Sequence, residues 1–291
     1  MDQSIANLTS LINNEGYNQT VLSGVGIYKT SQSTDRIPLC YNQGVIIILQ
    51  GQKRVFFDHK TYHYNPDNYL VLTLPLAAEC ETIVEDGKPM ISLIIDFDIS
   101  VLSELVRVLD EHGQINQSDP AIENKGLYVS ECTDMLSCTI SRLTECLSSP
   151  LQCDIIGKGL LREIYFHMLT GPQAAPLFAL VSHNTYLSKM ERILKHLHNN
   201  FNSRLDVEQL ADMANMSSST FHRNFKQITA SSPIQYVKKI RLSRARELLQ
   251  DQGLKVKQAA AQVGYESPTQ FSREFTRYYG LSPSECAKSA V

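Results

Sequence analysis

The fold class that the sequence predicts is α+β, with an N-terminal antiparallel β-sandwich or barrel, helices after it, and a C-terminal all-α domain. Three observations predict this arrangement. The 291 residues fit two domains better than one. Short segments rich in β-branched and aromatic residues recur about every ten residues over the first hundred. An internal repeat with an offset of 50 residues, from Phe221 to Phe271, occupies the end of the chain. We place the domain boundary between residues 183 and 184.

Seven segments of the N-terminal domain have the composition of strands. Turn residues such as Gly51-Gln52 and Asp58-His59 separate them, and no helical pattern intervenes. This spacing favours an antiparallel sandwich or barrel. The segments are 21–29, 44–50, 52–57, 60–64, 69–74, 78–84 and 90–97.

Helices are expected after the strands. Apolar residues recur at helical spacing in 99–111, 131–148 and 152–169. The apolar faces of the first two could form a dimer interface, and they could equally cover an open face of the barrel. Residues 171–183 have the composition of a connection between domains, and a further helix is expected over 184–200.

Charge is unevenly distributed along the chain. Residues 1–183 contain 11 Lys and Arg against 21 Asp and Glu, a net charge of −10, whereas residues 184–291 contain 16 against 9, a net charge of +7. The C-terminal part is therefore expected to meet a polyanion. The longest apolar run, Val45–Leu49, is too short to span a membrane. Because the N-terminus lacks a signal-peptide pattern, we expect a cytoplasmic protein.

The C-terminal part contains two copies of one supersecondary unit. The stretch FHRNF at 221–225 matches FSREF at 271–275, and Ser232-Pro233 matches Ser282-Pro283. Each copy combines a short helix, a tight turn and a second helix whose outer face is polar and basic. That order is typical of a helix-turn-helix. A helix over about 233–249 connects the two units.

The outer faces of the two second helices carry side chains that suit DNA. Arg can pair with guanine, Gln with adenine, and Ser or Thr with either. Lys and Arg can also neutralise phosphates, which supplies affinity rather than specificity. The phosphate-contacting candidates are Lys226, Arg241, Arg244 and Arg277.

Residues 184–286 resemble the DNA-binding domain of AraC/XylS-type transcriptional regulators, most clearly in the stretch VGYESPTQFSREFTRYYGLSP. The front half is similar to the N-terminal domain of one subgroup, over Leu49–Val55, Tyr62–Leu72 and Arg162–Pro172. The resemblance implies a cupin-like barrel that senses a ligand, forms a dimer, or does both. It also implies the base-contacting candidates, which are Ser219, His222 and Arg223 in the first unit and Thr269, Gln270, Ser272 and Arg273 in the second.

The resemblance implies a sequence-specific transcriptional regulator, with double-stranded promoter DNA and RNA polymerase as expected partners. A small-molecule effector and a homodimer are further expectations. One rival interpretation is a cupin-type enzyme with a DNA-targeting module, and another is an architectural binder without sequence preference. We expect no catalysis, because no catalytic constellation is found, and recognition helices with Arg223 and Arg273 argue against the architectural binder.

Two weaker signals lie in the front half. His59 and His63 are four residues apart, about 13 Å along a strand, which is too far to share a metal, so we expect no metal and no cofactor. The odd number of cysteines, seven, argues against a disulfide framework. Cys132 and Cys146 lie on an apolar helical stripe and are expected to be buried, whereas Cys138 and Cys153 are the better candidates for a reactive thiol.

Overall fold

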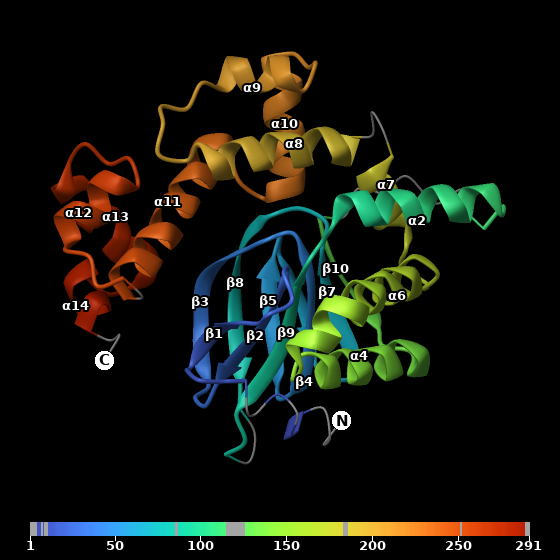
Figure 1. Cartoon of the computed structure of the whole chain (residues 1–291). Coiled ribbons are helices and arrows are strands. Elements are labelled where there is room, and N and C mark those ends of the chain that lie inside the picture. The colour runs from blue at the N-terminus through green and yellow to red at the C-terminus, as the bar shows by residue number, and fades with distance from the viewer. Residues whose placement is uncertain are drawn as a thin grey trace. The chain divides into compact units, whose positions relative to one another are not determined.

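The computed structural model describes residues 5–6, 8, 11–84, 87–114, 126–182, 186–250 and 252–288 (Figure 1). Contacts divide the chain into two compact units. Unit 1 comprises residues 1–36, 42–74 and 80–188, and unit 2 comprises residues 37–41, 75–79 and 189–291. The predicted boundary at 183/184 lies outside the described residues.

The strands of the N-terminal half form two antiparallel sheets. The six-stranded sheet has the order β1 (Gly16–Gln19), β2 (Val25–Thr30), β9 (Met90–Asp96), β4 (Gly44–Gln50), β7 (Asn68–Leu72), β10 (Leu127–Glu131). The four-stranded sheet has the order β3 (Thr34–Tyr41), β8 (Leu76–Ile83), β5 (Gln52–Phe57), β6 (Lys60–Tyr64). The prediction of an antiparallel β-domain with following helices is confirmed.

Three strands were not predicted, and all three lie at sheet edges. β1 and β10 are the outer strands of the larger sheet, and β3 is an outer strand of the smaller one. β3 contains Pro38, which an edge strand tolerates because one side of its ladder needs no partner. β1 and β3 bury only one residue each, as polar edge strands do. β10 has only five residues, although Leu127, Tyr128 and Ser130 are buried.

The larger sheet has one face covered by helices. Residues of α2 (Ile99–Glu111), α4 (Asp134–Cys146), α6 (Lys158–Leu169) and α7 (Ala175–Val181) share one apolar core with alternate residues of β2, β4 and β9. Leu102 and Leu143, for example, are fully buried in this core. The apolar faces of the first two helices therefore cover a sheet, which was one of the two alternatives left open by the sequence.

Residues 171–183, predicted as a connection between domains, contain the helix α7. Pro176 occupies the first turn of this helix, where a missing N–H costs nothing, and Leu177 is fully buried in the core of unit 1. The helix predicted over 152–169 also differs. It consists of α5 (Pro150–Gln152), a π-helical turn η1 (Cys153–Gly157), and α6.

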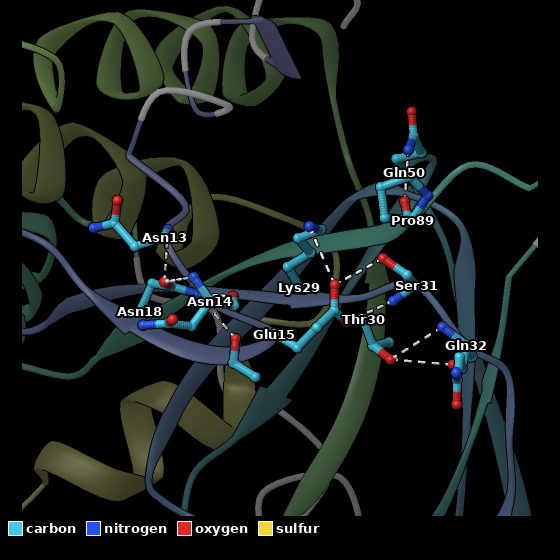
Figure 2. Close-up of polar contacts among 11 residues, drawn as sticks. Asn13, Asn14, Glu15, Asn18, Lys29, Thr30, Ser31, Gln32, Gln50 and Pro89 are labelled. Carbon is cyan, nitrogen blue, oxygen red and sulfur yellow. Dashed lines mark hydrogen bonds and ion pairs between the residues drawn. The ribbon is translucent and has the colours of Figure 1, made fainter. Parts of the chain in front are cut away.

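The lead-in to β1 is fixed by polar contacts that Figure 2 shows. The Asn18 side-chain oxygen accepts hydrogen bonds from the backbone N–H groups of Asn13 and Asn14, both at 3.1 Å. Glu15 forms an ion pair of 3.1 Å with Lys29 on β2. These contacts satisfy Asn18, which is 7% exposed, and they hold the first hairpin at the sheet edge.

Unit 2 is helical apart from two short strand segments. Its helices are α8 (Tyr186–Asn199), which begins just before the unit, α9 (Val207–Met213), α10 (Ser218–Thr229), α11 (Pro233–Gln250), α12 (Val256–Gln262), α13 (Pro268–Tyr279) and α14 (Pro283–Lys288). The pairs α9–α10 and α12–α13 are the two predicted helix-turn-helix units, and α11 connects them (Figure 1). No helix among the described residues is long and apolar enough to cross a membrane.

Candidate nucleic-acid interface

The first helix-turn-helix is defined by two side-chain caps and a tight turn. The Asp206 carboxylate accepts the backbone N–H groups of Glu208 and Gln209 at 3.0 and 3.1 Å, which starts α9. Asn215 has a φ of +53° and redirects the chain, because Asn tolerates the left-handed region better than most residues. Ser217 then caps α10 through the N–H of Thr220 at 3.4 Å.

The two faces of α10 have different environments. Phe221 and Phe225 are fully buried, with ring centroids 5.5 Å apart, and they fix the helix to its unit. Ser219, His222 and Arg223 are exposed on the other face. Lys226 is exposed as well. The outward orientation predicted for these four side chains is what the structure shows, and their contacts with bases or phosphate stay predictions.

The second unit repeats this construction. Gly264, with a φ of +84°, makes the turn between α12 and α13. Ser267 caps α13 through the N–H of Gln270 at 3.3 Å, and Pro268 occupies the first turn. Phe271 and Phe275 are fully buried, with centroids 5.5 Å apart. The repeat in sequence is therefore a repeat in local structure.

The outward side chains of α13 differ in how free they are. Thr269, Arg273 and Arg277 are exposed. Gln270 is exposed too, but its amide N–H donates to Glu274 at 3.2 Å. Ser272 is partly buried, and its hydroxyl donates to the Pro268 carbonyl oxygen at 3.0 Å. Gln270 and Ser272 would have to exchange these bonds to read a base.

Three cations on the recognition helices lack protein partners. Arg223, Lys226 and Arg273 form no hydrogen bond or ion pair with any residue that the structure describes. An exposed guanidinium without a carboxylate is available for the bidentate contact with guanine that Arg makes in the major groove.

The two arginines of α11 that were phosphate candidates are engaged within unit 2. The Arg241 guanidinium donates to three carbonyl oxygens, those of Phe201 at 2.7 Å, Ser203 at 2.8 Å and Gly264 at 3.1 Å. Arg244 pairs with Glu247 one turn along the helix and remains exposed. Arg241 thus ties the loop before α9 and the turn of the second unit to the connecting helix.

A buried carboxylate that sequence reasoning missed fixes α13 to α11. Glu274 is 8% exposed, forms an ion pair of 3.0 Å with Lys238, and accepts the Tyr265 hydroxyl at 2.9 Å. Burial opposes its ionisation, but the hydrogen bonds from Lys238, Gln270 and Tyr265 outweigh burial and hold the pKa of Glu274 below its usual value. The available signal was the repeat itself, in which the matching residue is the uncharged Asn224.

The structure confirms some of the predictions about cysteine burial and contradicts others. Cys146 is buried as expected, Cys132 is only partly buried, and Cys138 is exposed. Cys153 was a candidate for a reactive thiol, but it is buried beside Cys146, with 3.9 Å between the two sulfurs. Burial and the neighbouring Cys146 raise the pKa of Cys153, which disfavours the reactive thiolate. In the helical turn that Cys153 begins, Cys153 and Gly157 are buried, whereas Ile155 and Ile156 are exposed, so the local sequence does not indicate which residues face the core.

The histidines of the front half do not form a metal site. His59 has a φ of +60° and, with Asp58, makes the two-residue turn between β5 and β6. His63 lies within β6, opposite Arg54 on β5. Among the described residues, no group of three His, Cys, Asp or Glu side chains is placed to hold a metal ion.

Two helix-turn-helix units, each with an exposed arginine on its second helix, define a DNA-binding protein. Comparison with known families specifies the class. Residues 21–176 match the model of the AraC-type transcriptional regulator N-terminus, and residues 210–289 match a helix-turn-helix domain model. Because the first match covers more than half of the chain, the protein belongs to the AraC-type transcriptional regulators, and these are regulators rather than enzymes.

Individual relatives agree with this assignment. The lactose operon transcription activator of Staphylococcus xylosus is 23% identical over 82% of this chain and 81% of its own length. A helix-turn-helix transcriptional regulator of Haemophilus influenzae is 42% identical over 83 residues, so this chain spans only 28% of that relative. ToxT of Vibrio cholerae, in a structure with a bound unsaturated fatty acid, shares the fold with a TM-score of 0.59 and 16% identity, covering 95% of this chain and 96% of ToxT.

Proposed function

We propose that the protein binds promoter DNA through both helix-turn-helix units, with α10 and α13 in successive major grooves. The observation that carries the proposal is the pair of exposed, unpartnered arginines, Arg223 and Arg273, at matching positions of the two units. The length of α11 supports its role as a spacer, because 18 helical residues extend about 27 Å. One turn of DNA separates successive grooves by about 34 Å.

The base contacts that we propose are those expected from the sequence, without Gln270 and Ser272, whose side chains are hydrogen-bonded within α13. Arg223 and Arg273 pair with guanines, and Lys226 and Arg277 neutralise phosphates. Ser219, His222 and Thr269 supply further base contacts, because all three are exposed on the same faces. Arg241 is removed from the phosphate set in this proposal, since its guanidinium is engaged by three carbonyl groups.

We further propose that unit 1 modulates DNA binding through a small-molecule effector or a second copy of the chain. The proposal is supported by the match of residues 21–176 to the N-terminus of AraC-type transcriptional regulators. The name of the Staphylococcus xylosus relative supports activation of transcription, which requires contact with RNA polymerase. A protein with this role acts in the cytoplasm, on the nucleoid.

The test is selection of DNA from a random pool by the full-length protein at near-physiological salt. We expect two short motifs about one helical turn apart. Arg223→Ala and Arg273→Ala should each relax selection at one base pair of one motif and leave the other motif intact. Recovery of a single motif, or loss of both motifs in each variant, would contradict reading by two independent units.

Regulation by unit 1 has its own test. Promoter activity is measured in cells that contain either the full chain or residues 184–291 alone. We expect the truncated protein to lose its response to growth conditions. Equal control of the promoter by both proteins under every condition would contradict a regulatory role for unit 1.

A further inference from the structure

A lysine side chain lies inside the β-domain of unit 1. Lys53, on β5, is 7% exposed, and Val55, on the same face of the strand, is fully buried. The Lys53 ammonium lies 4.7 Å from the centre of the Tyr28 ring, which belongs to β2 of the other sheet. The side chain therefore extends from the smaller sheet toward the inner face of the larger one.

The charge of this lysine is not balanced. Among the residues that the structure describes, Lys53 forms no ion pair and no hydrogen bond; its charged end lies over the Tyr28 ring and near the Cys80 thiol. Burial lowers the pKa of Lys53, so the protein bears a free-energy cost for keeping this group charged. Lysine is almost never fully buried in proteins without a partner, which indicates that a partner is supplied from outside the chain.

The surroundings of Lys53 restrict what that partner can be. Tyr28 pairs with Ser92, and Ser92 pairs with Ile48, so these three side chains share one face of the larger sheet. Ile46, two residues from Ile48, points the same way, and both isoleucines are buried. This face is the one opposite to the helix-covered core. A ligand that meets Lys53 here meets one cation, the Ser92 hydroxyl, aromatic rings and aliphatic side chains.

We propose that Lys53 anchors a ligand site inside unit 1, and that its ligand is a small organic acid with one carboxylate and an apolar body. The carboxylate lies against the ammonium and supplies the missing negative charge. The apolar body packs on Ile46, Ile48 and the Tyr28 ring. This inference gives a chemical class to the effector, and it rests on the proposed function for its regulatory meaning, although binding itself requires no DNA.

The first measurement needs no ligand. Lys53→Met keeps the length of the side chain and removes the charge, and Lys60→Met, at an exposed position of the adjacent strand β6, is the matched control. We expect hydrogen exchange of the β5 amides in full-length Lys53→Met to be about 5- to 30-fold slower than in the wild type, because an unpaired buried charge is removed. Faster exchange in Lys53→Met would mean that Lys53 stabilises the empty domain, and this would overturn the proposal.

The second measurement is calorimetric titration of the full-length protein with sodium benzoate and sodium butyrate. Benzyl alcohol and butanol are the uncharged counterparts, and inorganic phosphate is the anion without an apolar body. We expect the acids to bind the wild type and Lys60→Met, and to bind Lys53→Met about 10- to 100-fold more weakly. The alcohols and phosphate should not bind.

Three results would overturn the inference: no binding of either acid to the wild type, equal affinity in Lys53→Met, or binding of phosphate as tight as that of the acids. Neither measurement contains DNA. A protein that selects its two DNA motifs but fails these titrations would therefore disprove the ligand site alone, and the reverse result would disprove only the DNA-binding proposal.

Discussion

Arg241 offers the sharpest test of how unit 2 is held together. Substitution of Arg241 by Met keeps the aliphatic stem and removes the guanidinium, which donates to the carbonyl oxygens of Phe201, Ser203 and Gly264. These carbonyls belong to the loop before the first unit and to the turn of the second. The variant should therefore loosen both attachments to α11 at once.

The magnitude follows from the three hydrogen bonds. A hydrogen bond from a charged donor contributes roughly 1.5–3 kcal/mol. Because Arg241 is only partly buried, water will replace part of what is lost. We therefore expect a total loss of about 2–4 kcal/mol in the free energy of opening of α12 and α13, which corresponds to roughly 30- to 700-fold faster hydrogen exchange of their amides.

The assay is hydrogen exchange of the full-length protein by mass spectrometry, together with DNA binding at several salt concentrations. Arg244→Met is the matched control, since Arg244 lies on the same helix and is exposed, where it pairs with Glu247. That variant should leave exchange almost unchanged, because surface ion pairs contribute little. If Arg241→Met leaves exchange unchanged and instead lowers the salt dependence by about one phosphate contact, then Arg241 contacts DNA and the reasoning is refuted.

Three further predictions concern the same unit. Arg273→Ala should cost about 1–3 kcal/mol on the selected DNA and relax specificity at one base pair, whereas Lys226→Ala should weaken specific and random DNA alike; equal losses for both variants on both DNAs would contradict the roles. Burial lowers the pKa of His198 to about 4, below its unfolded value near 6.5. Unit 2 should therefore lose about 2–3 kcal/mol of stability as the pH falls from 6.5 to 4. His198→Phe should flatten this pH dependence in urea titrations; the same pH dependence in the variant and the wild type would contradict the prediction. Gly264→Ala adds a Cβ that collides with the backbone carbonyl of Asn202 and must also adopt a positive φ, whereas in Gly280→Ala only the positive φ is unfavourable. The first variant should lose about 2–4 kcal/mol of stability and the second about 1 kcal/mol in thermal unfolding. Equal losses would mean that the collision at Gly264 is relieved.

The sequence predicts the features that repeat or alternate. The central strands are short runs rich in β-branched and apolar residues, such as Val45–Leu49, and turn residues bound them, so their positions follow from composition. The two helix-turn-helix units are visible because Phe221 and Phe225 recur as Phe271 and Phe275, all four fully buried. The helices and caps of these units likewise follow from local residues such as Ser217 and Ser267.

Interactions between distant residues are what the sequence does not predict. Arg241 looked like one more basic residue on an outer face, because nothing near it in sequence indicates that Phe201 and Gly264 surround it. Lys53 lies in the predicted strand 52–57, but nothing near it in sequence indicates that its side chain is buried against Tyr28 from the other sheet. Burial of single charged residues is a property of tertiary packing, and local patterns carry little information about it.

The hydrogen bonds from Arg241 to Phe201, Ser203 and Gly264 have a consequence for how target promoters can change. With both units fixed to α11, the distance and angle between the two recognition helices belong to the protein and not to the DNA. A base substitution in one motif weakens a promoter by a limited amount, which a better base elsewhere can restore. One inserted base pair between the motifs turns the second by about 34° and shifts it by about 3.4 Å, which no substitution repairs. Promoters of this regulator should therefore vary in their motifs but keep a constant gap, and a genome search should hold that gap fixed.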